Sequence, residues 1–189
     1  MNRKRCAWAE VSDLDREYHD NEWAIPIYDE RKLFECLTLE GAQAGLSWST
    51  ILKKREGYRL LFDHFDIEKI SQYDQEKIDA LILDTRIVRH RLKINSVITN
   101  AHAFIKIQQE CGSFSEYLWN YVDNKPIINH WENMTEVPAT TELSNALSKD
   151  LKKRGFKFVG PTICYAFLQA TGVINDHLVN CPCYVKHNI

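Results

Sequence analysis

The chain has 189 residues, 44% of them hydrophobic, with seven glycines, five prolines and a formal net charge of −2. That much apolar material is enough for one compact core and nothing marks a linker, so we predict a single domain over residues 1–189. The near-neutral charge excludes a surface that binds polyanions all over, and any contact with nucleic acid must come from a local basic patch.

The sequence also bounds the compartment. The N-terminus is basic, but no apolar segment of a signal peptide follows it, and no apolar run approaches the length that spans a membrane. We therefore expect a cytoplasmic protein without a membrane partner. Six cysteines in a chain of this size do not suggest a disulfide scaffold, and we assign no chemistry to Cys36, Cys111 and Cys164.

Capping residues that precede apolar residues at helical spacing predict most of the secondary structure. The predicted caps, in chain order, are Asp13, Asp29, Ser47, Asp66, Asp74, Ser113 and Thr141. A longer helix is predicted from about Val88 to Gln109, and residues 123–140 form the main loop. Because no stretch alternates with a period of two, we predict an all-α fold.

The stretch 141–172 predicts a helix, a tight hairpin and a second helix. Gly155 ends the first helix because glycine accepts a left-handed conformation, and Pro161 suits the first position of the second. The unpaired N–H groups that open the second helix form a ready site for a phosphate. A basic run alone would indicate only a solvated helix end, but its combination with the two glycines and Pro161 favours the phosphate site. The basic residues are Lys149, Lys152, Lys153, Arg154 and Lys157.

Four residues from the two ends of the chain form a candidate metal site. His177 and Cys181 are four residues apart, so on one helical turn both would project from the same face toward one ion. Cys6 and His19 offer two further ligands, and two thiolates with two neutral imidazoles match a closed tetrahedral zinc site. The spacing is not that of a zinc finger, so ordinary thiols and ordinary polar histidines remain the alternative.

Residues 39–48, LEGAQAGLSW, form a candidate pocket. They place a carboxylate, two glycines and a tryptophan in one predicted turn between helices. Glycines let a backbone approach a ligand closely, Trp48 offers a flat face for a nucleobase, and Glu40 accepts hydrogen bonds from amino groups or favours a cation. The alternative is a loop with a core tryptophan and an exposed glutamate.

Several long and irregular motifs run through the chain. They are HDNEW at 19–23, LEGAQAGLSW at 39–48, LKKR at 52–55, RHRLKI at 89–94, and KKRGFKFVGPTICYAFLQA at 152–170, followed by NDH at 175–177 and Cys181. These motifs closely resemble the bacterial 3-methyladenine DNA glycosylase I family, and the match runs from about Cys6 to Tyr184.

The resemblance implies an all-α fold of the helix-hairpin-helix glycosylase superfamily, with the helix-hairpin-helix at about 141–172. It also implies one structural zinc ion, which would join segments 6–19 and 177–181. The implied ligands are Cys6, His19, His177 and Cys181.

The resemblance further implies a base-excision repair enzyme that flips out 3-methyladenine and removes it hydrolytically from alkylated double-stranded DNA. In that family the residues that correspond to Glu40, Tyr18 and Trp48 hold the flipped base, and those that correspond to Trp8 and Trp23 help to form the aromatic pocket. The released product is free 3-methyladenine.

Two residues depart from the family's pattern. Asp15 stands where some members have an aromatic residue near the pocket, which leaves one pocket wall open, and Ala7 stands where a glycine is usual.

The remaining expectations concern DNA contacts and catalysis. We expect a monomer without strand-cleaving activity, since no lysine stands out as a Schiff-base nucleophile, and we expect Asp176 to cap a helix or orient His177. Phosphate contacts are predicted for Lys153, Arg154, Lys157 and Gly160. Gln43 and Leu46 are the candidates to fill the gap that the flipped base leaves in the duplex.

Two other functions compete with this interpretation. A zinc-stabilised DNA-binding module without catalysis would use the hairpin alone and keep its aromatic residues in the core. A zinc hydrolase would need an open coordination position, and four protein ligands argue against it.

Overall fold

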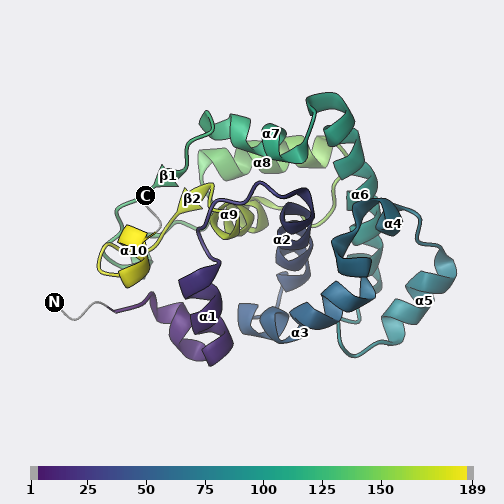
Figure 1. The fold of residues 1–189 in the computed structure, drawn as a ribbon, viewed down its shortest axis with the longest axis horizontal. Coiled ribbons are helices and arrows are strands. Elements are labelled where there is room, and N and C mark those ends of the chain that lie inside the picture. Colours follow the sequence, from purple (N-terminus) through teal and green to yellow (C-terminus); the bar gives the residue numbers. More distant parts are fainter. Residues whose placement is uncertain (1–3, 187–189) are drawn as a thin grey trace.

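The computed structural model describes residues 4–186, with side chains as far as Tyr184 (Figure 1). The α-helices are α1 (Asp13–Asn21), α2 (Glu30–Gln43), α3 (Trp48–Leu61), α4 (Ile67–Ser71), α5 (Gln75–Leu83), α6 (Arg91–Cys111), α7 (Phe114–Trp119), α8 (Glu142–Lys153), α9 (Pro161–Ala170) and α10 (Pro182–Lys186). Short 3-10 helices are η1 (Ala7–Val11), η2 (Asp63–Phe65), η3 (Asn120–Val122) and η4 (Met134–Glu136).

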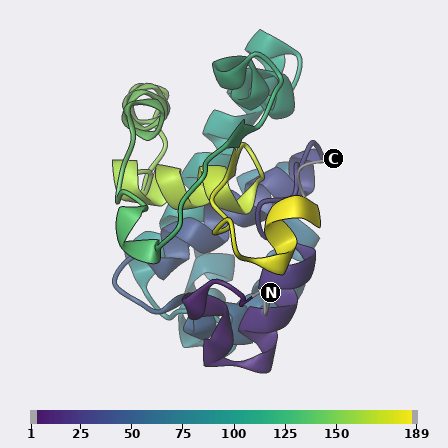
Figure 2. The ribbon, with the colours of Figure 1, turned by 90° about the vertical axis from the view of Figure 1, so that its left-hand side faces the viewer.

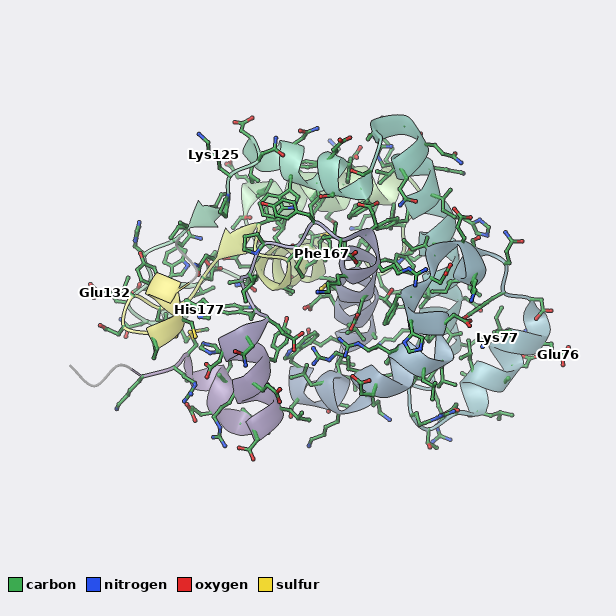
Figure 3. The ribbon with its side chains drawn as sticks, viewed as in Figure 1. Glu76, Lys77, Lys125, Glu132, Phe167 and His177 are labelled. Atoms are coloured by element: carbon green, nitrogen blue, oxygen red, sulfur yellow. The ribbon has the colours of Figure 1, made fainter. Side chains whose placement is uncertain are left out.

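Helices α2 and α9 lie side by side at the centre of the fold, and the other helices surround them (Figures 1 and 2). Helix α6 packs against α2, α8 packs against α9, and α1 packs against α3. The core is aromatic: Phe104 stacks on Phe114 with 4.1 Å between ring centroids, and Phe34 meets Phe104 edge-on. Phe167 of α9 is fully buried in the same core (Figure 3). This core fixes the two central helices.

Most helix starts follow from the predicted caps. Asp29, Ser47, Asp66, Asp74, Ser113 and Thr141 each accept a hydrogen bond from a backbone N–H in the first turn, as predicted. The predicted cap at Asp13 is wrong, because α1 already begins at Asp13 and its cap is Ser12, whose hydroxyl accepts a hydrogen bond from Asp15 N. The long helix begins at Arg91 rather than Val88, since His90 Nδ1 caps it by accepting from Lys93 N.

Two short strands depart from the purely helical prediction. Strand β1 (Ile127–Ile128) in the main loop pairs in parallel with β2 (Ile174–Asn175), which follows α9. Ile127 lies opposite Ile174, and Ile128 lies opposite Asn175. Two residues are too few to show a period of two, so the sequence carries no signal for this pair. The pair ties the main loop to the segment that leads to His177.

Helices α8 and α9 are joined by the short turn that the sequence predicted. Gly155 has φ +95°, in the left-handed region, and directly follows the last residues of α8. Pro161 is the first residue of α9, after Gly160. The turn brings Phe158 against α2: a Cβ atom on Gly41 would lie 3.3 Å from Phe158 Cβ. We refer to residues 154–160 as the hairpin.

The two ends of the described chain meet in a second, smaller cluster of buried side chains. It contains Cys6, Tyr18 and Trp23 from the N-terminal part and Cys181 and Cys183 from the C-terminal part. In Figure 1, α10 lies close above α1, although the chain positions differ by more than 150 residues. The N-terminal aromatic residues are thereby held against the centre of the molecule.

Candidate active site and metal cluster

A cavity of about 400 Å³ lies between α1, the C-terminal end of α2, the start of α3, α9 and the main loop. Every residue predicted to form the base pocket borders it. The lining residues are Trp8, Tyr18, Trp23, Glu40, Gln43, Trp48, Met134, Val137, Pro138, Ala139, Thr162, Tyr165, Ala166 and Gln169. The cavity is large enough for a flipped purine and is mainly aromatic and aliphatic.

Glu40 supplies the acidic group of this cavity. It lies inside α2, which runs through Gly41 to Gln43, so the prediction that Glu40 and Gly41 lie in a turn is wrong. The glutamate is 4% exposed, and no hydrogen bond among the described residues engages its carboxyl group. Burial raises its pKa from 4.5 to about 8. Burial therefore favours the protonated form of this carboxyl group near neutral pH.

Four aromatic rings line the same cavity as this carboxyl group. The Tyr18 and Trp48 ring centroids are 5.2 Å apart, and Trp8 and Trp23 meet nearly edge-on at 5.1 Å. Burial, and then the charge of Glu40, raises the pKa of Tyr18 well above 10, so its hydroxyl keeps its proton. Trp48 is the first residue of α3 and is only half-buried. The rings form a cage that suits a flat, electron-poor ligand.

Two walls of the cavity were missed by the sequence reasoning. Helix α9 contributes Thr162, Tyr165, Ala166 and Gln169, whose helical spacing is a signal that could have indicated a shared face. The main loop contributes Met134, Val137, Pro138 and Ala139, and no local pattern in an irregular segment predicts that placement.

Asp176 holds these two walls together. It is fully buried and accepts hydrogen bonds from Asn129 and Trp131 of the main loop and from Tyr165 and Gln169 of α9. It caps no helix, so that part of its predicted role is wrong, and it does not line the cavity. Four donors stabilise one buried carboxylate and fix the loop against α9.

Asp15, which departs from the family's pattern, lies outside the cavity. It is 2% exposed, its carboxylate accepts from the Ser12 hydroxyl, and it does not border the cavity.

The residues predicted to contact DNA lie at two loops with different surroundings. Gln43 borders the cavity, while Leu46 in the turn after α2 is 41% exposed. In the hairpin, Lys157 is exposed, whereas Arg154 forms ion pairs with Asp150 at 2.7 Å and Glu110 at 2.6 Å. Lys153 is exposed and borders a recess between α6 and α8 that also contains Lys106 and Arg154; Gly160 is half-buried at the start of α9.

The four predicted metal ligands converge into one buried cluster. Their ligand atoms all lie within 4.8 Å of one another, and all four residues are fully buried. Cys181 Sγ is 3.5 Å from His19 Nε2 and 3.6 Å from His177 Nδ1, and Cys6 Sγ is 3.9 Å from His177 Nδ1. Tetrahedral zinc with ordinary bond lengths sets sulfur and nitrogen about 3.6 Å apart, so the donor set fits that ion.

The route by which these residues meet differs from the prediction. His177 and Cys181 do not share a helical turn; they lie in the irregular segment between β2 and α10 (Figure 3). Hydrogen bonding with Cys6, and then with the two histidines, lowers the pKa of the Cys181 thiol, as a ligand thiolate requires. Asp20 Oδ1 lies 2.8 Å from His19 Nδ1, and this contact orients the imidazole. The Asp20 carboxylate is itself held by an ion pair with Arg5.

The helical fold places an aromatic cavity with a buried carboxyl group beside an exposed turn and a basic hairpin. This arrangement is that of a DNA glycosylase, the class of enzyme that receives a base extruded from the duplex. The model of the methyladenine glycosylase family matches residues 8–184. The chain therefore belongs to the methyladenine glycosylase family.

Individual relatives cover almost the whole chain. It is 49% identical over 181 residues to DNA-3-methyladenine glycosylase 1 of Escherichia coli K12, which covers 96% of this chain and 97% of the relative. The identity to DNA-3-methyladenine glycosylase of Haemophilus influenzae is 48% over 180 residues, with 95% and 97% covered. A solved structure of 3-methyladenine DNA glycosylase I from Staphylococcus aureus has a TM-score of 0.93 at 42% identity and covers 97% of each chain. Within residues 4–186, no helix is both long and apolar enough to cross a bilayer.

Proposed function

We propose that this enzyme hydrolytically removes 3-methyladenine from alkylated double-stranded DNA and releases the free base. The observation that carries the proposal is the Glu40 carboxyl group, which is buried, has no hydrogen-bond partner among the described residues and borders the aromatic cavity. Such a group costs stability until a ligand compensates it, and a cationic base with an exocyclic amine does so.

The chemistry needs little acid catalysis. Adenine methylated at N3 carries a positive charge, which weakens its bond to the sugar. Water adds to C1′ of the deoxyribose, the bond from C1′ to N9 breaks, and its electron pair neutralises the departing base while the water proton passes to solvent. No enzyme amine forms a bond to the sugar in this scheme, so the enzyme is monofunctional and leaves the DNA strand intact.

Each cavity residue has a role in this scheme. Trp48 stacks on the cationic base, a contact worth on the order of 0.5 to 2 kcal/mol. Glu40 releases its proton to solvent when the cation arrives, and the carboxylate accepts a hydrogen bond from the exocyclic amine. The Tyr18 hydroxyl, which keeps its proton, hydrogen-bonds to the base edge, and Trp8 and Trp23 close the opposite wall.

The two loops bind the duplex. The exposed Lys157 and the open backbone N–H groups at Gly160 anchor phosphates as a helix-hairpin-helix, with Lys153 and Arg154 contributing charge around the hairpin. The exposed Leu46 fills the vacated stack, and Gln43 supports it from the cavity side. We assign one glycosylase domain to residues 1–189 and expect it to act as a monomer.

The Cys6, His19, His177 and Cys181 cluster would hold a structural zinc ion. Zinc with four protein ligands supplies a cross-link between distant segments. The cluster lies beside the cavity: the His19 and Trp8 ring centroids are 5.3 Å apart, and the His177 and Trp23 ring centroids are 4.7 Å apart. These four residues therefore support the aromatic wall and stay outside the reaction.

Chromatography of the bases released from methylated duplex DNA tests the proposal. Wild type should release 3-methyladenine, and Glu40→Gln and Trp48→Ala should each lower the release rate by at least tenfold. Glu76→Gln is the matched control, because Glu76 is exposed on α5, far from His177 (Figure 3). Protein that binds the DNA but liberates no base, with binding unaffected by the two cavity variants, would instead be a non-catalytic DNA-binding module.

A further inference from the structure

Helix α6 carries a buried lysine that the proposed chemistry does not use. Lys93 is 9% exposed, and its Nζ donates to the carbonyl oxygens of Ala42 at 2.8 Å and Ala44 at 2.6 Å. Its described partners are thus carbonyl groups at the C-terminal end of α2, where the helix dipole favours a cation. Burial lowers the pKa of this ammonium group, so keeping it there costs stability. The contact fixes the start of the turn that carries Leu46.

A second buried polar residue on α6 holds the other loop. Asn100 is 5% exposed, and its amide makes two hydrogen bonds to one residue of the hairpin: Nδ2 donates to Lys157 O at 3.0 Å, and Oδ1 accepts from Lys157 N at 2.8 Å. Both polar groups of the side chain are therefore committed to the hairpin backbone.

Lys93 and Asn100 lie on one face of a single rigid element. They are seven residues apart, which is two helical turns or about 10 Å along the helix axis. The hairpin also packs directly against α2, the helix that ends in the other loop, through the close approach of Phe158 to Gly41. The turn after α2 and the hairpin are therefore attached to a common support, and neither attachment residue borders the cavity.

We propose that Lys93 and Asn100 are positioning residues that hold the α2–α3 turn and the hairpin at one fixed separation, so that both loops engage the same duplex. The inference rests on the proposed function, because it assumes that these loops contact DNA. In a stiff duplex, the phosphates and the gap left by the flipped base lie at a set distance from each other. Two loops that are already held at that separation lose less conformational entropy when they bind.

The test compares duplex binding with binding of the free base. Lys93→Met removes the ammonium group at similar length, and Asn100→Ala removes the clamp on the hairpin. For each, KM and kcat are measured on methylated duplex, affinity for free 3-methyladenine is measured by tryptophan fluorescence, and duplex affinity is measured with an abasic analogue. We expect KM and the duplex dissociation constant to rise at least tenfold, while kcat and free-base affinity change less than threefold.

Matched controls are Asn95→Ala on the same helix and Lys125→Met near β1, because both side chains are exposed and neither belongs to the hairpin or its surroundings. They should leave all four quantities unchanged. If one variant fails to fold, the other still decides the question. Unchanged KM in folded variants overturns the inference, and so does a parallel loss of free-base affinity, since that would mean that these residues only stabilise the cavity. Absence of base release by wild type would instead refute the proposed function, and duplex affinity would still test the positioning role.

Discussion

Glu40 pays a cost in stability for its place in the cavity. Burial raises its pKa from 4.5 to about 8. Between pH 4.5 and about pH 8, the folded chain therefore keeps a proton on Glu40 that the unfolded chain has lost. The unfolded state therefore binds fewer protons, and the free energy of unfolding falls as pH rises through this window. Binding a cationic base reverses the cost.

We therefore predict that Glu40→Gln raises the melting temperature by an amount that grows with pH. The gain should be on the order of 5 °C at pH 8 and close to zero at pH 4.5, because the amide has no proton to lose. Thermal unfolding of both proteins across this pH range measures it, with Glu76→Gln as the exposed control. A gain that is the same at every pH would contradict the burial argument.

Activity should follow the opposite trend. A cation is recognised by the ionised carboxylate, and that form of the free enzyme dominates only above pH about 8. The kcat/KM for base release should therefore rise between pH 6 and 9 with an apparent pKa near 8, and Glu40→Gln should give a low, flat profile. A flat wild-type profile would show that Glu40 ionises without cost.

Gly172 is a second single residue on which the fold depends. It has φ +70°, and a Cβ atom there would lie 2.3 Å from the carbonyl carbon of Ile25. Gly172→Ala should destabilise the protein by about 3 kcal/mol or more, measured by urea unfolding. Gly160→Ala is the control, because Gly160 has negative φ and nothing within 4 Å of such a Cβ atom, and it should change stability by less than about 1 kcal/mol.

At the scale of elements, the helices were largely predictable because their signals are local. The side chains of Ser47 and Thr141 cap the helices that follow them by bonding groups only three residues away. By contrast, the approach of the main loop to Asp176 depends on hydrogen bonds across 45 and 47 residues, which no local pattern encodes. The sequence predicted that Cys6, His19, His177 and Cys181 converge, and they do, but it did not predict the irregular path that brings His177 to the others.

The zinc ion proposed at Cys6, His19, His177 and Cys181 should act as a cross-link between elements. Removing zinc with a chelator should lower the wild-type melting temperature by on the order of 10 °C, because segments 6–19 and 177–181 lose their joint partner. Cys181→Ser should start from the lower value and respond little to the chelator, while its turnover in the folded state persists. Cys111→Ser, outside the cluster, should behave as wild type. A folded Cys181→Ser variant with abolished turnover would assign the cluster a chemical role.

At the scale of the whole molecule, a net charge of −2 makes DNA binding depend on a few cations. Lys157→Ala should weaken duplex binding and reduce the slope of log affinity against log salt by about 1. Its backbone bonds to Asn100 remain, so stability should hold. Lys125→Ala, an exposed lysine near β1 (Figure 3), should leave the slope unchanged.

Arg154 should respond differently although it belongs to the same hairpin. Its guanidinium group bonds Asp150 and Glu110, which ties α8 to α6. Arg154→Ala should therefore lower the melting temperature as well as DNA affinity, and circular dichroism during heating distinguishes it from Lys157→Ala. Equal melting temperatures for the two variants would mean that the ion pairs of Arg154 contribute nothing to the fold.

The contacts between Cys181 and His19 span 162 positions, and those between Cys6 and His177 span 171. During synthesis, Cys6 and His19 leave the ribosome early but meet His177 and Cys181 only after nearly all of the described chain has emerged. We therefore expect a nascent or interrupted chain to lack the cross-link behind the aromatic wall, and its cavity to retain a nucleobase poorly.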